Sequence, residues 1–228
     1  MANDLAKYID HTLLSPNATP EQISRLCKEA KENSFFAVCV NPFYVGQCIK
    51  ELRSSKVRVA TVIGFPLGQN LMETKVEETR RAIKDGAHEI DMVINVGALK
   101  AGDIDYVTEE IKEVVKVAGN GEVPVKVIIE CDLLTDEEKI AATEACIKAG
   151  AFMVKTSTGF VKDGKGATVE DITLMKKTIG NHKLEIKASA GIRDAEKAIA
   201  LVKAGATRLC TSAGVAIVQG ATTAGASY

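Results

Sequence analysis

The chain is built from eight short apolar runs, each followed by a longer segment with helical character. Strands that alternate with helices of ten residues or more form right-handed βαβ units around a parallel sheet. Eight such units without a break in composition predict closure into a TIM (β/α)8 barrel, and 228 residues suit one domain of this kind. An open doubly wound sheet is the alternative. The runs span 8–10, 36–40, 57–63, 89–95, 123–129, 152–156, 184–188 and 207–210.

Residues that typically begin a helix lie between these runs. Thr19 is expected to cap a helix that begins at Pro20, and Thr135 precedes three acidic residues that suit a first turn. Further helices are expected over 44–53, 72–84, 105–117, 136–148, 169–178 and 195–203, with a short one from 215. No linker divides the chain. We therefore expect a single barrel domain over 1–219, followed by a mobile tail over 220–228.

Composition excludes several classes of partner. The net charge of −1 gives no basic field for nucleic acid, and aromatic residues make up only 4% of the chain. No apolar run approaches the roughly 20 residues of a membrane span. The first residues lack the features of a signal peptide, and the six cysteines show neither C-x-x-C pairs nor grouping with histidines. We expect a cytoplasmic protein with reduced thiols and with no nucleic-acid or membrane partner.

Charged residues in three of the runs are candidates for chemistry, because barrel active sites lie at the carboxyl ends of the strands. In 89–95, period two places Glu89, Asp91 and Asn95 on one face, which we expect to point into the barrel. A carboxylate there is costly unless it has a partner or a task. Asp91 is the candidate, with a purely structural ion pair as the alternative.

Two lysines occupy equivalent places in neighbouring runs. Lys155 shares a face with Ser157, and Lys187 shares a face with Ser189, on strands expected about 4.8 Å apart. Repulsion between the ammonium groups, with partial desolvation, is expected to lower the pKa of one lysine and make it a nucleophile, while Asp91 balances the charge. A buried Lys–Asp ion pair with a spectator lysine is the alternative.

Two loops have the composition of a phosphate site. Residues 189–193 follow the seventh run and 211–214 follow the eighth, where barrels of this type hold phosphate beside a short helix. Small residues let backbone N–H groups approach the anion. The three histidines, His11, His88 and His182, show no metal-ligand spacing, and no dinucleotide fingerprint follows the first run. We expect a phosphorylated substrate, no metal, no other cofactor and no catalytic histidine.

Five motifs, in order and nearly end to end, resemble the deoxyribose-phosphate aldolase family. They lie at 10–12, 37–40, 89–95, 154–160 and 186–189. The resemblance implies a class I aldolase on a TIM barrel that needs no metal. It would reversibly cleave 2-deoxy-D-ribose 5-phosphate to D-glyceraldehyde 3-phosphate and acetaldehyde, its small-molecule partners. A homo-oligomer, either a dimer or a tetramer, is compatible with the resemblance, although the sequence does not set the number of copies.

The same resemblance implies roles for individual residues. Lys155 matches the Schiff-base lysine, Lys187 the second lysine that perturbs it and transfers protons, and Asp91 the aspartate of the proton relay. Tyr228 matches a terminal tyrosine that carries protons in some members. The positions that match substrate contacts, mainly to phosphate, are Thr158, Gly159, Ala190, Gly191, Ser212 and Ala213.

Two departures from the family pattern fall in the phosphate loops. Ala190-Gly191 stands where Gly-Gly is usual, and 210–213 reads Cys-Thr-Ser-Ala where Gly-Thr-Ser-Ser is usual. Ala190 keeps its backbone donor if its φ is ordinary, whereas the alanine at 213 removes a hydroxyl. We hypothesise that Lys162 or Lys165 supplies compensating charge.

Three other functions fit the same residues. The first is a class I aldolase or transaldolase for a different sugar phosphate. The second is a phosphate-binding barrel isomerase without a covalent step, and the third is a barrel that binds its ligand without turnover.

Overall fold

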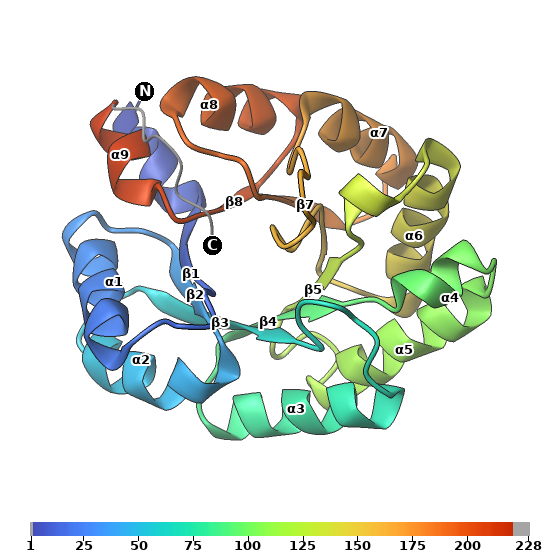
Figure 1. Cartoon of the computed structure of the whole chain (residues 1–228), viewed down its shortest axis with the longest axis horizontal. Helices are drawn as coiled ribbons and strands as arrows, with labels where there is room; N and C mark the ends of the chain where they lie inside the picture. The colour runs from blue at the N-terminus through green and yellow to red at the C-terminus, as the bar shows by residue number, and fades with distance from the viewer. Residues whose placement is uncertain (1, 221–228) are drawn as a thin grey trace.

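The computed structural model describes residues 2–220, in which eight parallel strands close into a barrel (Figure 1). Each strand pairs with the next, and β1 pairs with β8, so the barrel prediction is confirmed and the open sheet is excluded. The predicted tail lies outside the described residues from residue 221 onward. The strands are β1 Ile9–Leu13, β2 Ala37–Val40, β3 Arg58–Ile63, β4 Glu89–Val93, β5 Val125–Ile128, β6 Met153–Lys155, β7 Glu185–Ser189 and β8 Arg208–Thr211.

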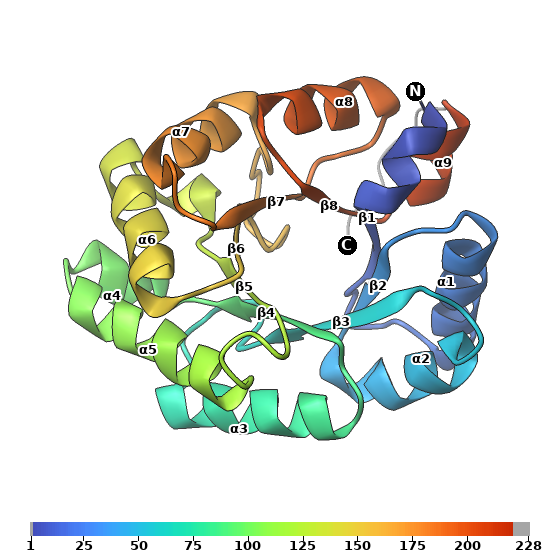
Figure 2. The ribbon, with the colours of Figure 1, turned by 180° about the vertical axis from the view of Figure 1, so that it is seen from behind.

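Helices form a ring outside the strands, as both views along the barrel show (Figures 1 and 2). Thr19 and Thr135 cap α1 and α6 as predicted, each accepting a backbone N–H three residues on. No helix within residues 2–220 has the length and apolar character that a membrane crossing requires. The helices are α1 Pro20–Glu32, α2 Val45–Leu52, α3 Met72–Lys84, α4 Val96–Lys100, α5 Ile104–Val117, α6 Asp136–Ala149, α7 Val169–Ile179, α8 Ala195–Ala204 and α9 Gly214–Gln219, with 3-10 turns η1 Ala2–Tyr8, η2 Pro42–Tyr44 and η3 Cys131–Leu133.

The end of β4 differs from the prediction. We expected Asn95 to continue the inward face of this strand, but β4 ends at Val93. Asn95 instead caps α4, and its side chain accepts the N–H of Ala98 at 3.0 Å. Asparagine favours this place because its side chain satisfies a backbone donor that a helix start leaves open.

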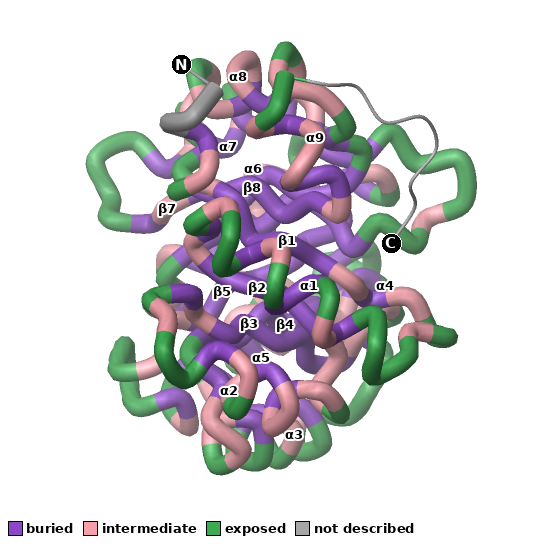
Figure 3. The backbone as a smooth tube through the Cα atoms, turned by 90° about the vertical axis from the view of Figure 1, so that its left-hand side faces the viewer, coloured by how far each residue is buried: buried purple, intermediate pink, exposed green. Residues whose placement is uncertain are grey.

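The apolar core lies between the strands and the helices, where the buried strands occupy the middle of the molecule (Figure 3). On β4, Ile90 and Met92 belong to this core, as period two predicts. The alternate residues Glu89 and Asp91 are equally buried but polar. The barrel interior therefore holds charged side chains, and the fold places them away from water.

Candidate active site

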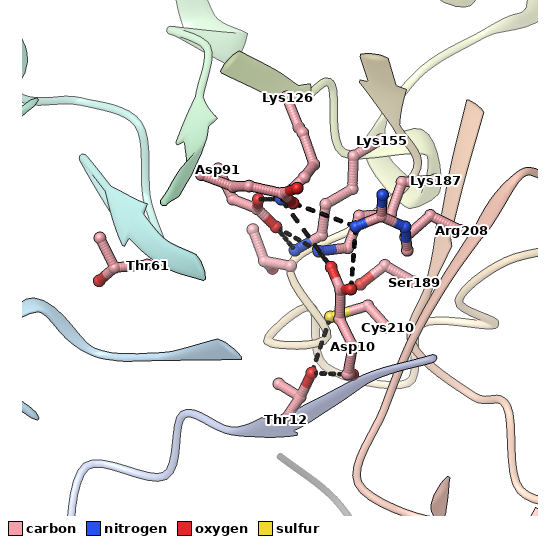
Figure 4. Close-up of polar contacts among 12 residues, drawn as sticks. Asp10, Thr12, Thr61, Asp91, Lys126, Lys155, Lys187, Ser189, Arg208 and Cys210 are labelled. Carbon is pink, nitrogen blue, oxygen red and sulfur yellow. Dashed lines mark hydrogen bonds and ion pairs between the residues drawn. The ribbon is translucent and has the colours of Figure 1, made fainter. Parts of the chain in front are cut away.

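Asp91, Lys155 and Lys187 meet inside the barrel (Figure 4). The register of β6 and β7 sets Lys155 directly beside Lys187. Asp91 Oδ2 accepts a hydrogen bond of 2.8 Å from each lysine Nζ. All three side chains are fully buried. The prediction that these residues lie together is confirmed.

Lys126 on β5 is a third lysine in the cluster, and the sequence reasoning missed it. Its Nζ donates to Asp91 Oδ1 at 2.6 Å and lies 2.7 Å from Glu89 Oε2. The two oxygens of Asp91 are thus divided: Oδ1 binds Lys126, and Oδ2 is shared by Lys155 and Lys187. Because Val125 belongs to the core outside the barrel, alternation along β5 places Lys126 inside the barrel.

Asp10 and Arg208 complete the cluster. Asp10 on β1 accepts hydrogen bonds from Lys187 Nζ and, at 3.1 Å, from Arg208 Nη1. Arg208 also lies 3.0 Å from Glu89. Both residues were missed, although Asp10 stands in one of the motifs quoted above. The cluster is therefore a network of ion pairs among side chains of six strands, β1, β4, β5, β6, β7 and β8.

The cluster carries an excess of positive charge. It holds four basic side chains (Lys126, Lys155, Lys187 and Arg208) and three carboxylates (Asp10, Glu89 and Asp91), a difference of 4 − 3 = +1. An unbalanced buried charge is costly, which favours the loss of one proton. Within 4 Å, Lys155 has one carboxylate, Lys187 has two and Lys126 has three among the described residues. Lys155 is the lysine whose charge is least supported.

The expectation that repulsion lowers the pKa of a lysine is wrong for the free protein. Burial lowers the pKa of Lys155, but the Asp91 carboxylate outweighs it, and the pKa lies above its ordinary value. The pKa of Lys187 lies well above its ordinary value, since Asp10 and Asp91 both oppose the effect of burial. Repulsion loses because Asp91 binds both ammonium groups. The two lysines still differ, because Lys155 has fewer carboxylate partners than Lys187 and therefore holds its proton less tightly.

Asp91 and Asp10 stay ionised. Burial raises the pKa of Asp91, but Lys126, Lys155 and Lys187 hold it well below its usual range. For Asp10, burial is outweighed mainly by Lys187 and Arg208, and the pKa falls to about 2. The cluster therefore presents an anionic Asp91 to any molecule that reacts at Lys155.

Cys210 of β8 lies near Lys155 and Lys187 (Figure 4). Its Sγ is 3.1 Å from the Thr12 hydroxyl oxygen. Burial raises the pKa of this thiol, but a hydrogen bond from Cys39 and the charges of Lys155 and Lys187 bring it well below its ordinary value. The excess positive charge can thus be removed by ionising Cys210 as well as by deprotonating Lys155.

Glu130 fixes the segment that follows Lys155, and sequence reasoning missed it as well. It has the left-handed φ of 61°, which is uncommon outside glycine. Its carboxylate accepts the Thr158 N–H at 3.1 Å and the Thr158 hydroxyl. Burial raises the pKa of Glu130 despite these bonds. Thr158 and Glu130 also line a cavity of about 330 Å³ whose walls include Val96 and Phe160.

The predicted phosphate residues after β7 have an unusual backbone. Ala190 has a φ of 71° and Gly191 a φ of 67°, so the condition that Ala190 keep an ordinary φ is not met. A Cβ added at Gly191 would lie 2.8 Å from the Lys165 carbonyl oxygen and 3.3 Å from Lys197 Nζ. A cation that the sequence reasoning did not single out, Lys197, therefore stands beside Gly191.

The other predicted substrate residues lie at the same end of the barrel. Gly159 is exposed after β6, and Ser212 is half-buried after β8. The Ala213 N–H donates to the Thr211 hydroxyl at 2.9 Å, so this donor is already used. Lys162 is exposed, as is Lys165. Tyr228 lies outside the described residues.

The histidines lie outside this cluster. His11 Nε2 is 2.7 Å from Glu29 of α1, and His88 Nδ1 accepts the Val59 N–H. His182 is exposed. Across residues 2–220, no three His, Cys, Asp or Glu side chains are grouped so as to hold a metal ion.

Comparisons with known proteins point to one family. Residues 5–224 match the profile of the DeoC/LacD family aldolases. The chain is 53% identical over 225 residues to a deoxyribose-phosphate aldolase of Brevibacillus brevis, covering 99% of this chain and 100% of the relative. It is 57% identical to one from Thermococcus gammatolerans, with 96% of each covered.

Solved structures give the same result. One described as the aldolase QR15 superposes with a TM-score of 0.89 at 41% identity, covering 95% of each chain. A tetrameric deoxyribose phosphate aldolase from Aeropyrum pernix superposes with a TM-score of 0.89 at 33% identity, covering 96% of this chain and 91% of that one.

Proposed function

Because the chain belongs to the DeoC/LacD family of aldolases, we propose that it is a class I aldolase that reversibly cleaves 2-deoxy-D-ribose 5-phosphate to D-glyceraldehyde 3-phosphate and acetaldehyde. The observation that carries the proposal is the buried Lys155, which shares one oxygen of Asp91 with Lys187. A lysine in this setting suits an imine with an aldehyde carbon.

The first step joins the substrate to Lys155. The neutral amine adds to C1 of the open-chain sugar, and the carbinolamine loses water to give an iminium ion. The amine must first give up its proton against the pull of Asp91, and it does so more readily than Lys187, because Lys155 has one carboxylate partner and Lys187 has two. Lys187 keeps its proton because it has two carboxylate partners, so it is the candidate acid for the departure of water.

The second step breaks the C2–C3 bond. A base removes the proton of the C3 hydroxyl, the bonding electrons move from C2–C3 towards the iminium nitrogen, and D-glyceraldehyde 3-phosphate leaves. The enamine that remains takes a proton at C2, and hydrolysis of the imine releases acetaldehyde. Asp91 is the candidate base, since it is ionised and contacts both lysines, and Lys187 can return the proton, with water as the carrier.

The phosphate is proposed to lie at the loops after β6, β7 and β8. Gly159, Gly191 and Ser212 stand at the barrel end that follows Lys155, and the Gly191 and Ser212 N–H groups donate no hydrogen bond within residues 2–220. Lys197 beside Gly191 would add positive charge. Ala190 and Thr158 would shape the pocket through their backbone, and Ala213 would contribute apolar contact.

Three further points belong to the proposal. We expect a homo-oligomer, either a dimer or a tetramer, and the Aeropyrum pernix relative is described as a tetramer. We expect the cytoplasm as its location, since all six cysteines are free and buried thiols. Tyr228 is proposed as an additional proton carrier, and unchanged turnover after its deletion would remove that idea.

A turnover assay tests the function. Cleavage of 2-deoxyribose 5-phosphate is followed by the D-glyceraldehyde 3-phosphate formed, in the parent protein and in Lys155→Leu. We expect the parent to turn over and the variant to lose at least about 1,000-fold in kcat, because the covalent step is lost. Cleavage of a different sugar phosphate only, or isomerisation without cleavage, would favour one of the other functions considered above. Binding without any turnover would favour the non-catalytic barrel.

A further inference from the structure

Two buried serine hydroxyls in the barrel lack a hydrogen-bond partner. They are Ser157 Oγ and Ser189 Oγ, and neither finds a donor or acceptor among residues 2–220. Both residues are almost fully buried. His11 Nδ1 is also unpartnered but belongs to a side chain that contacts α1 outside the barrel. The two serines are thus a pair of polar groups that the protein itself leaves unsatisfied.

The two serines lie one step beyond the two lysines. Ser189 follows Lys187 by two residues within β7, so the alternation that points Lys187 inward also directs Ser189 inward, and Ser157 follows Lys155 by two residues in the segment after β6. Figure 4 shows Ser189 beside Lys187 in the barrel interior. Thr156 joins the two segments, since its hydroxyl oxygen bonds both the N–H and the carbonyl of Ser189, each at 3.0 Å. Thr156 thus holds the backbone of Ser189, while the Ser189 hydroxyl has no partner among residues 2–220.

Leaving these hydroxyls unsatisfied is costly. A buried donor or acceptor without a partner costs about 1–3 kcal/mol, and native proteins contain few of them. In chain order both serines follow the lysines and precede the predicted phosphate residues Gly159 and Gly191. A bound molecule with a hydroxyl group between the lysines and the predicted phosphate residues would satisfy both serine hydroxyls.

The order of residues along the two strands matches the order of groups along the sugar. Along β6 and the segment after it the order is Lys155, Ser157, Gly159, and along β7 and the loop after it the order is Lys187, Ser189, Gly191. If C1 is joined to Lys155 and the C5 phosphate lies at the glycines, as in the proposed function on which this rests, the C3 and C4 hydroxyls fall between them. We propose that Ser157 and Ser189 bind the C4 hydroxyl and select substrates that carry it.

The test compares two acceptors in the synthetic direction, each with acetaldehyde. D-Glyceraldehyde 3-phosphate carries the hydroxyl that becomes the C4 hydroxyl, and 3-oxopropyl phosphate lacks it. Ser157→Ala and Ser189→Ala are each expected to lower kcat/KM for the hydroxylated acceptor by about ten-fold, and for the deoxy acceptor by less than about two-fold. The preference, which is the ratio of kcat/KM for the hydroxylated acceptor to kcat/KM for the deoxy acceptor, therefore falls.

A preference that stays within two-fold of the parent's in both variants overturns the proposal. A fall in only one variant assigns the contact to that serine and overturns it for the other. Ser55→Ala is the matched control, since the Ser55 hydroxyl bonds the Leu52 carbonyl far from the cluster, and it should keep the parent's preference. If an alanine variant does not fold, the cysteine variant keeps the shape and weakens the hydrogen bond.

Trapping with acetaldehyde and borohydride separates the two proposals. Acetaldehyde has no hydroxyl for the serines to bind, so both serine variants should form the adduct on Lys155. No adduct in the parent protein would remove the proposed function. An adduct in every variant, together with an unchanged preference between acceptors, would remove only the role of the serines.

Discussion

Replacing Lys126 by methionine should hold Lys155 in its charged form. Lys126 donates to Asp91 Oδ1 at 2.6 Å and lies 2.7 Å from Glu89, and methionine keeps much of its length without the charge. Three basic groups would then face three carboxylates, and the excess charge that favours deprotonation would be gone. Asp91 would then have only Lys155 and Lys187 as lysine partners, and its carboxylate would bind the Lys155 proton more strongly.

The size of the effect follows from the distance between the ammonium groups. Lys126 and Lys155 bind opposite oxygens of one carboxylate, which places their nitrogens about 5 Å apart, and at an effective dielectric constant of about 20 their repulsion is about 3 kcal/mol. Allowing for relaxation, the neutral fraction of Lys155 at a given pH should fall between about ten-fold and a hundred-fold. Loss of a buried ionic partner should also lower the free energy of unfolding by about 3 kcal/mol.

The assay measures how fast acetaldehyde and borohydride label Lys155 over a range of pH. The profile of Lys126→Met should move to more alkaline pH, because the proton of Lys155 is held more tightly. Lys75→Met is the matched control: Lys75 is also fully buried and bonds Glu110 at 2.6 Å, but it lies outside the cluster. It should lose stability and keep the parent's profile. A Lys126→Met profile that does not move, or moves to acid pH, would refute the charge argument.

Three further predictions concern the loops. Ala190→Gly should raise the free energy of unfolding by about 0.5–1 kcal/mol in a denaturant titration, because it relieves a left-handed alanine; a loss of stability would contradict this. Glu130→Ala and Thr158→Val should each destabilise the protein, and in a double-mutant cycle they should couple by about 1 kcal/mol, since one acts through the other; additive effects would show independence. Replacing Lys162 and Lys165 together by alanine should raise KM for 2-deoxyribose 5-phosphate several-fold if they supply charge to the pocket, and an unchanged KM rejects that hypothesis.

Much of the barrel could be predicted from the sequence, because the features that define its strands and helices depend on residues close together in the chain. The alternation of runs and helices gave the barrel, and period two within short strands directed Asp91, Lys155 and Lys187 inward. The equal height of the two lysines also followed, since Lys155 and Lys187 occupy the same place in their runs. Helix α4 was missed because five residues are too few to show a helical period.

The remaining features depend on contacts between distant segments. Lys126 stands alone among valines, and only its register opposite Asp91 reveals that it is an ionic partner. The direction of the Lys155 pKa depends on where the Asp91 carboxylate sits between the lysines, which spacing along the chain does not define. Ala190 takes a left-handed φ in a loop packed against Gly166, where an added Cβ would lie 2.4 Å from the Ala190 carbonyl oxygen.

The assignment of Lys155 as the nucleophile can be tested by a single labelling experiment. The protein is incubated with acetaldehyde, reduced with borohydride, digested and examined by mass spectrometry. We predict one ethyl group on Lys155 and none on Lys126 or Lys187, because Lys155 has the fewest carboxylates to hold its proton. An ethyl group on Lys187 instead, or no adduct in a protein that cleaves 2-deoxyribose 5-phosphate, would contradict the assignment.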